Sequence, residues 1–286
     1  MNSTPLFSIL VANYNNGSFL QKALDSAFNQ TYDNYEIIIV DDGSTDNSRD
    51  ILAQLQTKHN VKVFYNNKNR GCGYTKWECI ERANGEICGF MDADDALTKD
   101  ALEVMVKEHL TQPDASIIYS RCFVCDKMLN IKYVSTHQCP IPEDSTFLEY
   151  KRGAISHFVT FKKSFYKCTV GMNKELRMSE DLDLYYKLEE VGKTHFIDKP
   201  LYYYRTDTGE NTSLGRNLVE SAMWEVIAKT DAFHRRSINL EKIGIPLLVE
   251  INDSVFQHKM KQCREYKLGK CILHPKELIE TIKRHL

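Results

Sequence analysis

The stretch ANGEICGFMDADD, residues 83–95, ends a short apolar run in a group of three aspartates. Residues 87–91 have the composition and length of a buried strand, and Asp92, Asp94 and Asp95 follow it directly. Carboxylates this close together repel one another, so a cation or hydrogen-bond donors must offset the repulsion. We therefore expect a ligand site at the end of this strand.

The first half of the chain alternates apolar runs with segments of helical periodicity. The predicted strands are 6–12, 36–40, 61–65, 86–91 and 116–120. The predicted helices are 18–29, 46–58, 74–84 and 98–111. Strands separated by helices of this length indicate right-handed crossovers and a parallel sheet that is covered on both faces.

The second half has shorter, more strand-like segments, with a hairpin expected at 125–130. A helix follows at 179–192 with Ser179 as its cap, and 194–205 is expected to form two short strands that turn at Lys199-Pro200. Helical periodicity continues after about 216. The pattern predicts an α/β fold with a mixed, mainly parallel sheet flanked by helices, and a C-terminal helical extension.

Composition and charge exclude several classes of protein. The chain has 286 residues, 42% of them hydrophobic and 27% charged, which is typical of a globular protein. Its net charge of −2 gives no overall attraction to nucleic acid. No apolar run approaches the roughly 18 residues of a membrane span, and the N-terminus lacks the basic region of a signal peptide. We therefore expect a cytoplasmic protein whose nine cysteines are reduced.

Polar loops follow three of the predicted strands. They are NYNNG at 13–17, DDGSTD at 41–46 and DADD at 92–95. In an open parallel sheet, ligands bind beyond the carboxyl ends of the strands, so these loops should share one edge. Alternatively, the aspartates only cap the next helix or lie solvated in turns.

Phosphate binding by a glycine-rich loop is not supported. The chain has no G-x-x-x-x-G-K-[ST] motif, and NRGCGY at 69–74 lacks the third glycine of a dinucleotide fingerprint. A metal would then have to neutralise any bound diphosphate. The oxygens of Asp92 and Asp94 suit a hard cation such as Mg²⁺ or Mn²⁺.

A second acidic group, Glu180, Asp181 and Asp183, opens the helix predicted at 179–192. Acidic residues in a first helical turn complement the helix dipole and need no further role. Alternatively, Asp181 is a general base, whose position at a helix start would keep its basicity low. The sequence leaves both interpretations open.

Five segments together resemble the inverting family-2 glycosyltransferases, which have the GT-A fold. The segments, in chain order, are ILVANYNN, YEIIIVDDGSTDNS, NKNRGCGYTK, ANGEICGFMDADD and SEDLDLYYKL. The resemblance covers about residues 5–205. It implies a GT-A domain at 1–215, with a nucleotide-binding part at 1–120 and an acceptor part at 121–215, followed by the helical extension at 216–286.

The resemblance also assigns roles to single residues. It places Tyr14 against the nucleobase, which is expected to be uracil, and Asp42 in a hydrogen bond with that base. Asp94 would bind the metal, Asp92 would lie near the ribose and the metal's waters, and Asp181 would deprotonate the acceptor. The other donor-site residues would be Ala12, Asn69, Gly71, Lys76 and Ala93, with Glu180 and Asp95 in support.

The implied reaction is a metal-dependent, inverting transfer of one hexose or N-acetylhexosamine from a nucleotide-sugar, expected to be a UDP-sugar, to an acceptor hydroxyl. The cofactor would be Mn²⁺ or Mg²⁺. The expected acceptor is a carbohydrate or a lipid-linked saccharide in cell-surface polysaccharide assembly. The Q-x-x-R-W segment of processive synthases is absent, so transfer of a single sugar is expected.

One departure limits the resemblance, and one segment beyond it has two interpretations. Family members often carry A-R-N where this chain has Thr75-Lys76-Trp77, and a lysine supplies charge without the bidentate fork of an arginine. The C-terminal segment 256–286 is mildly basic, which suits either a solvated helical face or a peripheral contact with the inner membrane.

Two alternative functions remain open at this point. One is a non-catalytic nucleotide-sugar-binding module, in which Asp181 only caps a helix. The other is a sugar-nucleotidyltransferase, although residues 12–17 read ANYNNG and lack the glycine- and arginine-rich loop of such enzymes.

Overall fold

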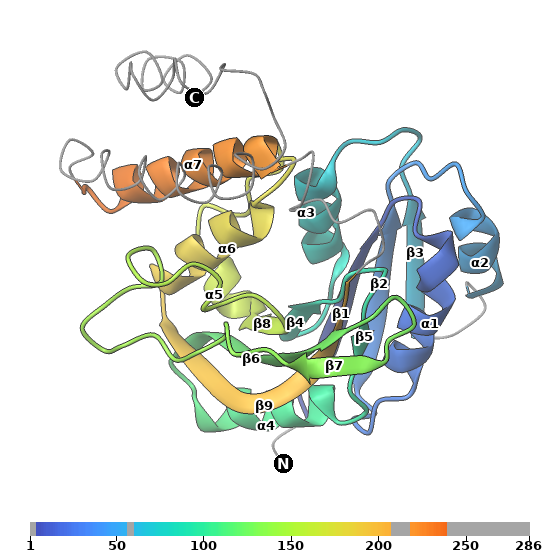
Figure 1. Cartoon of the computed structure of the whole chain (residues 1–286), viewed down its shortest axis with the longest axis horizontal. Helices are drawn as coiled ribbons and strands as arrows, with labels where there is room; N and C mark the ends of the chain where they lie inside the picture. The colour runs from blue at the N-terminus through green and yellow to red at the C-terminus, as the bar shows by residue number, and fades with distance from the viewer. Residues whose placement is uncertain (1–3, 56–59, 207–217, 239–286) are drawn as a thin grey trace. The chain divides into compact units, whose positions relative to one another are not determined.

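The computed structural model describes residues 4–55, 60–206 and 218–238 of the chain (Figure 1). Internal contacts divide the chain into two units, Met1–Asn211 and Thr212–Leu286. The first unit holds the whole sheet. The described part of the second unit contains helix α7, Leu218–Arg235. The basic segment 256–286 lies outside the described residues.

Four parallel strands form the first half of the sheet, in the spatial order β3, β2, β1, β4. Their bounds are β1 Phe7–Asn13, β2 Tyr35–Asp41, β3 Val61–Tyr65 and β4 Ile87–Phe90. The connecting helices are α1 Gly17–Phe28, α2 Ser48–Leu55 and α3 Cys72–Arg82. Phe7 pairs with both Tyr35 and Ile87, so β1, β2 and β4 start level with one another and end at the same edge, as predicted.

The second half of the sheet is mixed. Strand β8, Val159–Lys162, runs antiparallel to its neighbours β4 and β6, Ala115–Cys125. Strand β9, Lys193–Arg205, runs parallel to β6. The two-residue strand β5, Ala96–Leu97, pairs with β9 on the edge of β9 that faces away from β6. The predicted hairpin joins β6 to β7, Ile131–Val134. The sheet is therefore the mixed α/β sheet expected from the sequence.

The prediction of two short strands within 194–205 is wrong. Strand β9 is continuous and strongly curved (Figure 1). Its pairing register shifts where Arg121 of β6 meets Pro200. Proline has no N–H to donate and is tolerated where ladder pairing is interrupted, so Pro200 produces an irregularity in the strand and no turn.

Helices cover both faces of the sheet, because successive side chains of each buried strand point to opposite faces. Ile9 and Ile37 face the apolar cluster that contains α1, α2 and α4, Ala101–Thr111. Helix α3 packs on the opposite face, against β1 and β2. Helix α6, Glu180–Glu189, packs beside α3 and against β6, and the short helix α5, Lys163–Tyr166, contacts β8.

The expectations about thiols and membrane spans can be compared with the described residues. The seven cysteines among them are all free, including Cys122 and Cys125, which are buried on β6. Within the same residues, no helix has both the length and the hydropathy required to cross a bilayer.

Candidate active site

The loops after β1 and β2 are held together by buried polar side chains. Asn13 Nδ2 donates to Asp41 Oδ1 at 2.9 Å, and the Asp42 N–H donates to the Asn13 carbonyl at 2.8 Å. Arg49 Nε lies 3.0 Å from the other oxygen of Asp41. Asp41 is fully buried, so its carboxylate fixes the edge of the sheet and does not face a ligand.

Tyr14 stands at the rim of this edge, with its side chain 45% exposed. The next residue, Asn15, has a left-handed backbone with φ of 55° and ties the two loops together. Its N–H donates to Ser44 Oγ at 2.9 Å, and its Oδ1 accepts from the Thr45 N–H at 2.8 Å. The ring of Tyr14 is thus carried by a fixed turn, as a platform for a base requires.

Asp42 is 2% exposed, and both of its oxygens already accept hydrogen bonds. One accepts from Asn66 Nδ2 at 2.9 Å, and the backbone N–H groups of Arg70 and Gly71 lie 2.9–3.0 Å from the carboxylate. Asp42 therefore builds the loop that leads into α3. Gly71 is the N-cap residue just before α3 and has φ of 98°, a conformation that favours glycine. A hydrogen bond between Asp42 and a nucleobase stays a prediction.

The three aspartates after β4 differ sharply in environment, and this difference explains how the chain tolerates their mutual repulsion. Asp92 has a side chain that is 42% exposed, and its N–H donates to the Tyr202 hydroxyl at 3.0 Å. Asp95 is 1% exposed and accepts the Arg205 N–H at 2.7 Å. Burial, followed by the charges of Asp94 and Asp92, raises the pKa of Asp95 well above its ordinary value. Asp95 is thus a structural group, while Asp92 is open to a ligand.

Arg205 anchors this acidic loop and was not found from the sequence. It is 3% exposed, its guanidinium donates to the carbonyls of Asp94 and Lys127, and it lies 4.6 Å from the Phe19 ring centroid. The only sequence signal is a lone charge ending the apolar stretch LYYYR, residues 201–205. The backbone of the acidic loop therefore depends on β9, a strand more than a hundred residues away in the sequence.

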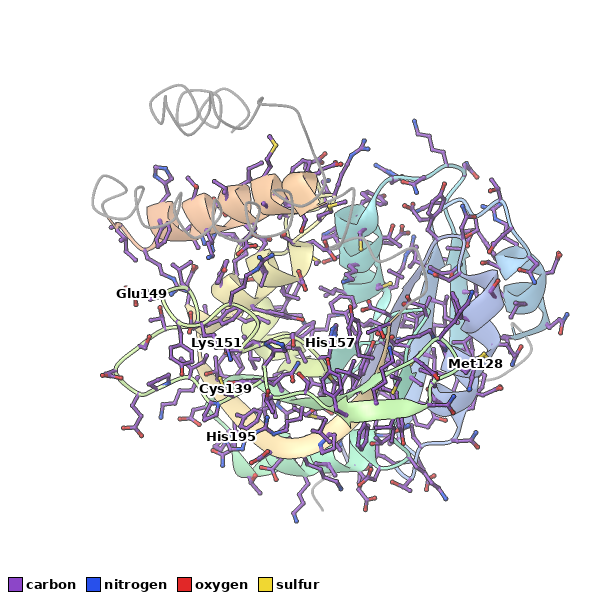
Figure 2. All side chains as sticks on the ribbon, viewed as in Figure 1. Met128, Cys139, Glu149, Lys151, His157 and His195 are labelled. Carbon is purple, nitrogen blue, oxygen red and sulfur yellow. The ribbon has the colours of Figure 1, made fainter. Side chains whose placement is uncertain are left out.

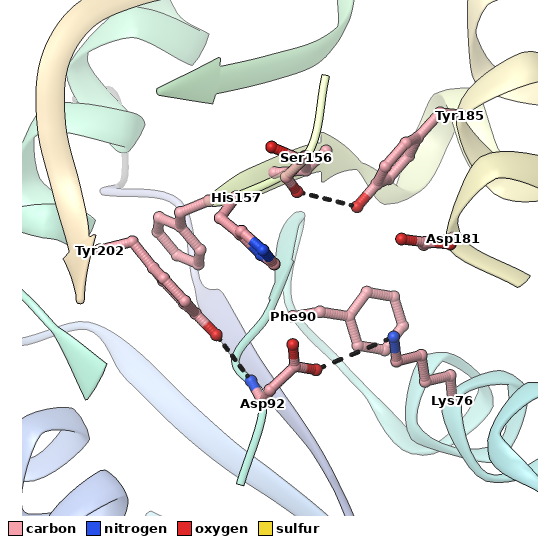
Figure 3. A pocket seen from close by; sticks show the side chains of 10 residues that line it. Lys76, Phe90, Asp92, Ser156, His157, Asp181, Tyr185 and Tyr202 are labelled. Carbon is pink, nitrogen blue, oxygen red and sulfur yellow. Dashed lines mark hydrogen bonds and ion pairs between the residues drawn. The ribbon is translucent and has the colours of Figure 1, made fainter. Parts of the chain in front are cut away.

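A cavity of about 30 Å³ joins the acidic loop to α6. Figure 3 shows Asp92 and Asp181 facing it from opposite sides, with Lys76 between them along one wall. A space of this volume holds a water molecule or two, so it is the floor of a site and not a whole sugar pocket. Its other lining residues are Phe90, Ser156, His157, Phe158, Val159, Tyr185 and Tyr202.

Lys76 is the electrostatic centre of the cavity. Its ammonium lies 2.8 Å from Glu180 Oε1 and 3.9 Å from Asp92 Oδ1, and the Cys72 thiol donates to the same Glu180 oxygen at 3.1 Å. Burial is the largest single influence and opposes the charge of Lys76, but the surrounding acidic groups, with Glu180 first and Asp92 and Asp181 after it, together raise the pKa of Lys76 well above its ordinary value. A cation therefore bridges the acidic loop after β4, α3 and α6.

Asp181 is a stronger base than its position at the start of α6 suggested. Burial, and then the negative charge of Glu180, raise the pKa of Asp181 from 3.8 to about 6, although Lys76 and the Leu182 N–H act against this. The expectation of low basicity was wrong because desolvation outweighs the helix dipole. Ser179 does occupy the N-cap position, but with a left-handed backbone and no capping hydrogen bond from its side chain.

The remaining predicted residues lie around the cavity or away from it. Ala12 pairs with Val40 in the sheet, and Ala93 is 2% exposed. Either residue can therefore contact a ligand only through its backbone, or leave space for one because its side chain is small. Asn69 is exposed on the loop after β3 and lies outside the cavity. The cavity likewise includes neither Tyr14 nor Asp42.

His157 is a cavity residue that no motif indicated. It precedes β8 (Figure 2), and its ring stacks on Tyr202 and Tyr204 with centroid separations of 5.3 and 4.6 Å. Burial lowers the pKa of His157, so the imidazole is neutral near pH 7. It faces the cavity as a hydrogen-bonding group without charge.

The acidic loop suits a cation that is shared with a ligand. Within the described residues, no group of three or more His, Cys, Asp or Glu side chains could hold a metal ion. Mg²⁺-type ions are commonly bound by one or two carboxylates together with substrate phosphates and water. Asp92 and Asp94, both at least partly exposed, fit this arrangement and do not fit a closed structural metal site.

Comparisons with known proteins agree in family and fold. The model of glycosyl transferase family 2 matches residues 8–171. Over 73% of its length the chain is 31% identical to "Chondroitin synthase" of Escherichia coli, and over 75% it is 29% identical to "Hyaluronan synthase" of Pasteurella multocida. The chain spans 30% and 22% of these two proteins, respectively.

Two solved structures show the same fold at low sequence identity. S. aureus TarS 1-349 in complex with UDP-GlcNAc has a TM-score of 0.62 and 19% identity, over 87% of this chain and 81% of TarS. The mannosyltransferase PcManGT from Pyrobaculum calidifontis, in complex with GDP-Man and Mn²⁺, has a TM-score of 0.60 and 12% identity. That alignment covers 97% of this chain and 81% of the mannosyltransferase.

Proposed function

The chain belongs to glycosyl transferase family 2 and is a glycosyltransferase with the GT-A fold, and from this premise we propose that it transfers one sugar from a UDP-sugar to an acceptor hydroxyl with inversion. The reaction depends on Mn²⁺ or Mg²⁺. The observation that carries the proposal is the single cavity that Asp92 of the acidic loop and Asp181 of α6 both line. A donor and an attacking hydroxyl can meet only where the two groups face the same space.

The donor is held at the shared edge of β1, β2 and β4. Tyr14 stacks on the base, and the loop built by Asp42 closes over the nucleotide. Asp92 and Asp94 would hold a divalent cation, which would supply positive charge for the departing diphosphate. The solved complexes of TarS with UDP and UDP-GlcNAc, and of the mannosyltransferase with GDP-Man and Mn²⁺, support this donor and cofactor chemistry.

Asp181 acts as the general base. Its carboxylate accepts the acceptor's hydroxyl proton, while the acceptor oxygen bonds to the anomeric carbon and the bond to the diphosphate breaks on the opposite face. A pKa of about 6 leaves Asp181 ionised near pH 7 and still basic enough to take the proton. The positive charge of Lys76, which is paired with Glu180, limits how far the pKa of Asp181 rises.

The acceptor is proposed to belong to cell-surface polysaccharide assembly. The support is the similarity to proteins named as chondroitin and hyaluronan synthases, of which this chain matches less than a third. We place the reaction in the cytoplasm, at the inner face of the membrane. The segment proposed to make that contact, 256–286, lies outside the described residues.

A nucleotide-sugar-binding module without activity is the remaining alternative. In such a module Asp181 would only cap α6, and the raised pKa would have no use. Hydrolysis or transfer of a panel of nucleotide-sugars with Mn²⁺ separates the two functions. Wild type and the exposed control Asp25→Asn should turn over a UDP-sugar, while Asp181→Asn should bind UDP normally and turn over nothing. Equal turnover by Asp181→Asn would reject the proposal.

A further inference from the structure

His157 lines the cavity of Asp92 and Asp181, but the proposed reaction leaves it without a role. Figure 3 shows its ring pointing into the space between the two carboxylates. Neither ring nitrogen has a hydrogen-bond partner among the described residues, and neither is sealed off from the cavity. The imidazole is therefore open to a ligand that enters this space.

The other uncharged polar side chains of the cavity already have partners in the protein. Ser156 Oγ accepts from Gln138 Nε2 at 2.6 Å, and the Tyr185 hydroxyl donates to the Ser156 carbonyl at 3.4 Å. The Tyr202 hydroxyl accepts the Asp92 N–H at 3.0 Å. Buried polar groups in proteins are usually paired, so one open group beside three paired ones indicates a group that is kept for a ligand.

Two tyrosines of β9 hold the imidazole in one orientation. Tyr202 and Tyr204 are two residues apart on the strand, so they point to the same face of the sheet. The His157 ring stacks on both, with interplanar angles of 5° and 21°. A ring that is already oriented loses little conformational entropy when it binds a hydroxyl group.

The same contacts fix His157 relative to the acidic loop. Tyr202 joins the two, because its ring stacks on His157 and its hydroxyl accepts the Asp92 N–H. Asp181, the proposed base, belongs instead to α6. The acidic loop is proposed to hold the donor's diphosphate, so a group attached to that loop faces the sugar that the diphosphate carries. The cavity of about 30 Å³ admits a hydroxyl of that sugar and not its whole ring.

We propose that His157 forms a hydrogen bond with one hydroxyl of the donor's sugar ring and thereby helps to select which nucleotide-sugar is used. The proposal rests on the proposed function, whose donor it makes more specific. Burial lowers the pKa of His157, and a neutral imidazole donates from one nitrogen and accepts at the other. Such a group discriminates against a sugar that lacks the hydroxyl or carries it in the other configuration, because the imidazole is then left unpaired.

The test measures affinities of the full chain by calorimetric titration, with Mn²⁺ and without acceptor. UDP, UDP-glucose, UDP-galactose, UDP-N-acetylglucosamine and UDP-N-acetylgalactosamine are compared, and the preferred donor is then tested as its monodeoxy derivatives. His157→Phe keeps an aromatic ring in the stack and removes the hydrogen bond. It should weaken binding of the preferred donor about fivefold or more and leave the affinity for UDP within about twofold. One monodeoxy donor should bind wild type about fivefold more weakly than its parent does, whereas His157→Phe should bind the two equally.

Two further variants separate a specific contact from a loss of packing. His157→Gln carries an amide that both donates and accepts, so it should bind the preferred donor within about threefold of wild type. The control His137→Phe changes an exposed histidine outside the cavity and should alter none of these affinities.

Several results would overturn the inference. If His157→Phe weakens the binding of UDP as much as that of the donor, His157 only supports the acidic loop. If each monodeoxy donor loses the same affinity in wild type and in His157→Phe, the imidazole contacts no hydroxyl of the sugar. A normal affinity for the donor with a raised KM for the acceptor would assign the ring to the acceptor. Turnover by wild type tests the proposed function separately, because the donor affinities do not require it.

Discussion

Replacing Asp181 with asparagine should stabilise the protein at pH 8 while abolishing turnover. The carboxylate is held in a site that disfavours its charge, since burial and Glu180 raise its pKa to about 6. Asparagine has nearly the same shape and keeps an oxygen to accept the Leu182 N–H, which lies 2.9 Å from Asp181 Oδ1. The substitution therefore removes the charge and little else.

The magnitude follows from the difference in pKa between the folded and unfolded states. Because the folded pKa is above the unfolded value of 3.8, the folded state binds more protons, and stability falls as the pH rises through about 6. Ionisation of Asp181 lowers the free energy of unfolding by up to about 3 kcal/mol at pH 8, and by roughly half of that at pH 5. Asp181→Asn should recover most of this cost at pH 8 and little at pH 4.

Urea unfolding of wild type and Asp181→Asn at pH 4, 5 and 8 measures this difference. The exposed control Asp25→Asn should change the free energy of unfolding by less than about 0.5 kcal/mol at every pH. A variant that is less stable than wild type at pH 8, or whose effect does not depend on pH, would refute the assignment of a strained carboxylate to position 181.

Three further predictions concern the same site and its supports. The kcat/KM of wild type should fall tenfold per pH unit below about pH 6, because protonated Asp181 cannot accept the acceptor's proton; a flat profile down to pH 5 would contradict this. Arg205→Met should weaken Mn²⁺-dependent UDP binding at least about fivefold in calorimetry, since the carbonyls of Asp94 and Lys127 lose their donor; unchanged affinity in a folded variant would show that the loop needs no anchor. Gly73→Ala should lower the free energy of unfolding by about 1–3 kcal/mol, because the added Cβ would clash with the Leu176 backbone. In the control Gly153→Ala the added Cβ meets nothing within 4 Å, so only the positive φ of that residue should lower the free energy of unfolding, by about 1 kcal/mol.

The parallel half of the sheet could be predicted because its signals are local. Each buried strand reads as an apolar run with a polar loop after it, and the rule for open parallel sheets brings those loops to one edge. The acidic loop after β4 was placed correctly for this reason. What the sequence could not show is how unlike its three aspartates are, because Asp95 is buried by residues of β9.

The second half of the site depends on contacts between distant segments. Arg205 contacts the acidic loop, and His157 contacts Tyr202, although each pair is far apart in the sequence. Hydrophobic periodicity is a local pattern and does not predict such contacts. Pro200 looked like a turn because proline is common in turns, but pairing with β6 keeps β9 continuous around it. Asp181 looked weakly basic because a sequence shows the start of a helix and does not show the burial that raises the pKa.

Turnover of a UDP-sugar by Asp181→Asn, measured where its Mn²⁺-dependent affinity for UDP equals that of wild type, tests the central claim most directly. If Asp181 is the base opposite a cation-bound donor, the rate should fall by about a hundredfold or more with the affinity unchanged. A variant that binds UDP normally and retains turnover within about tenfold of wild type would contradict that account.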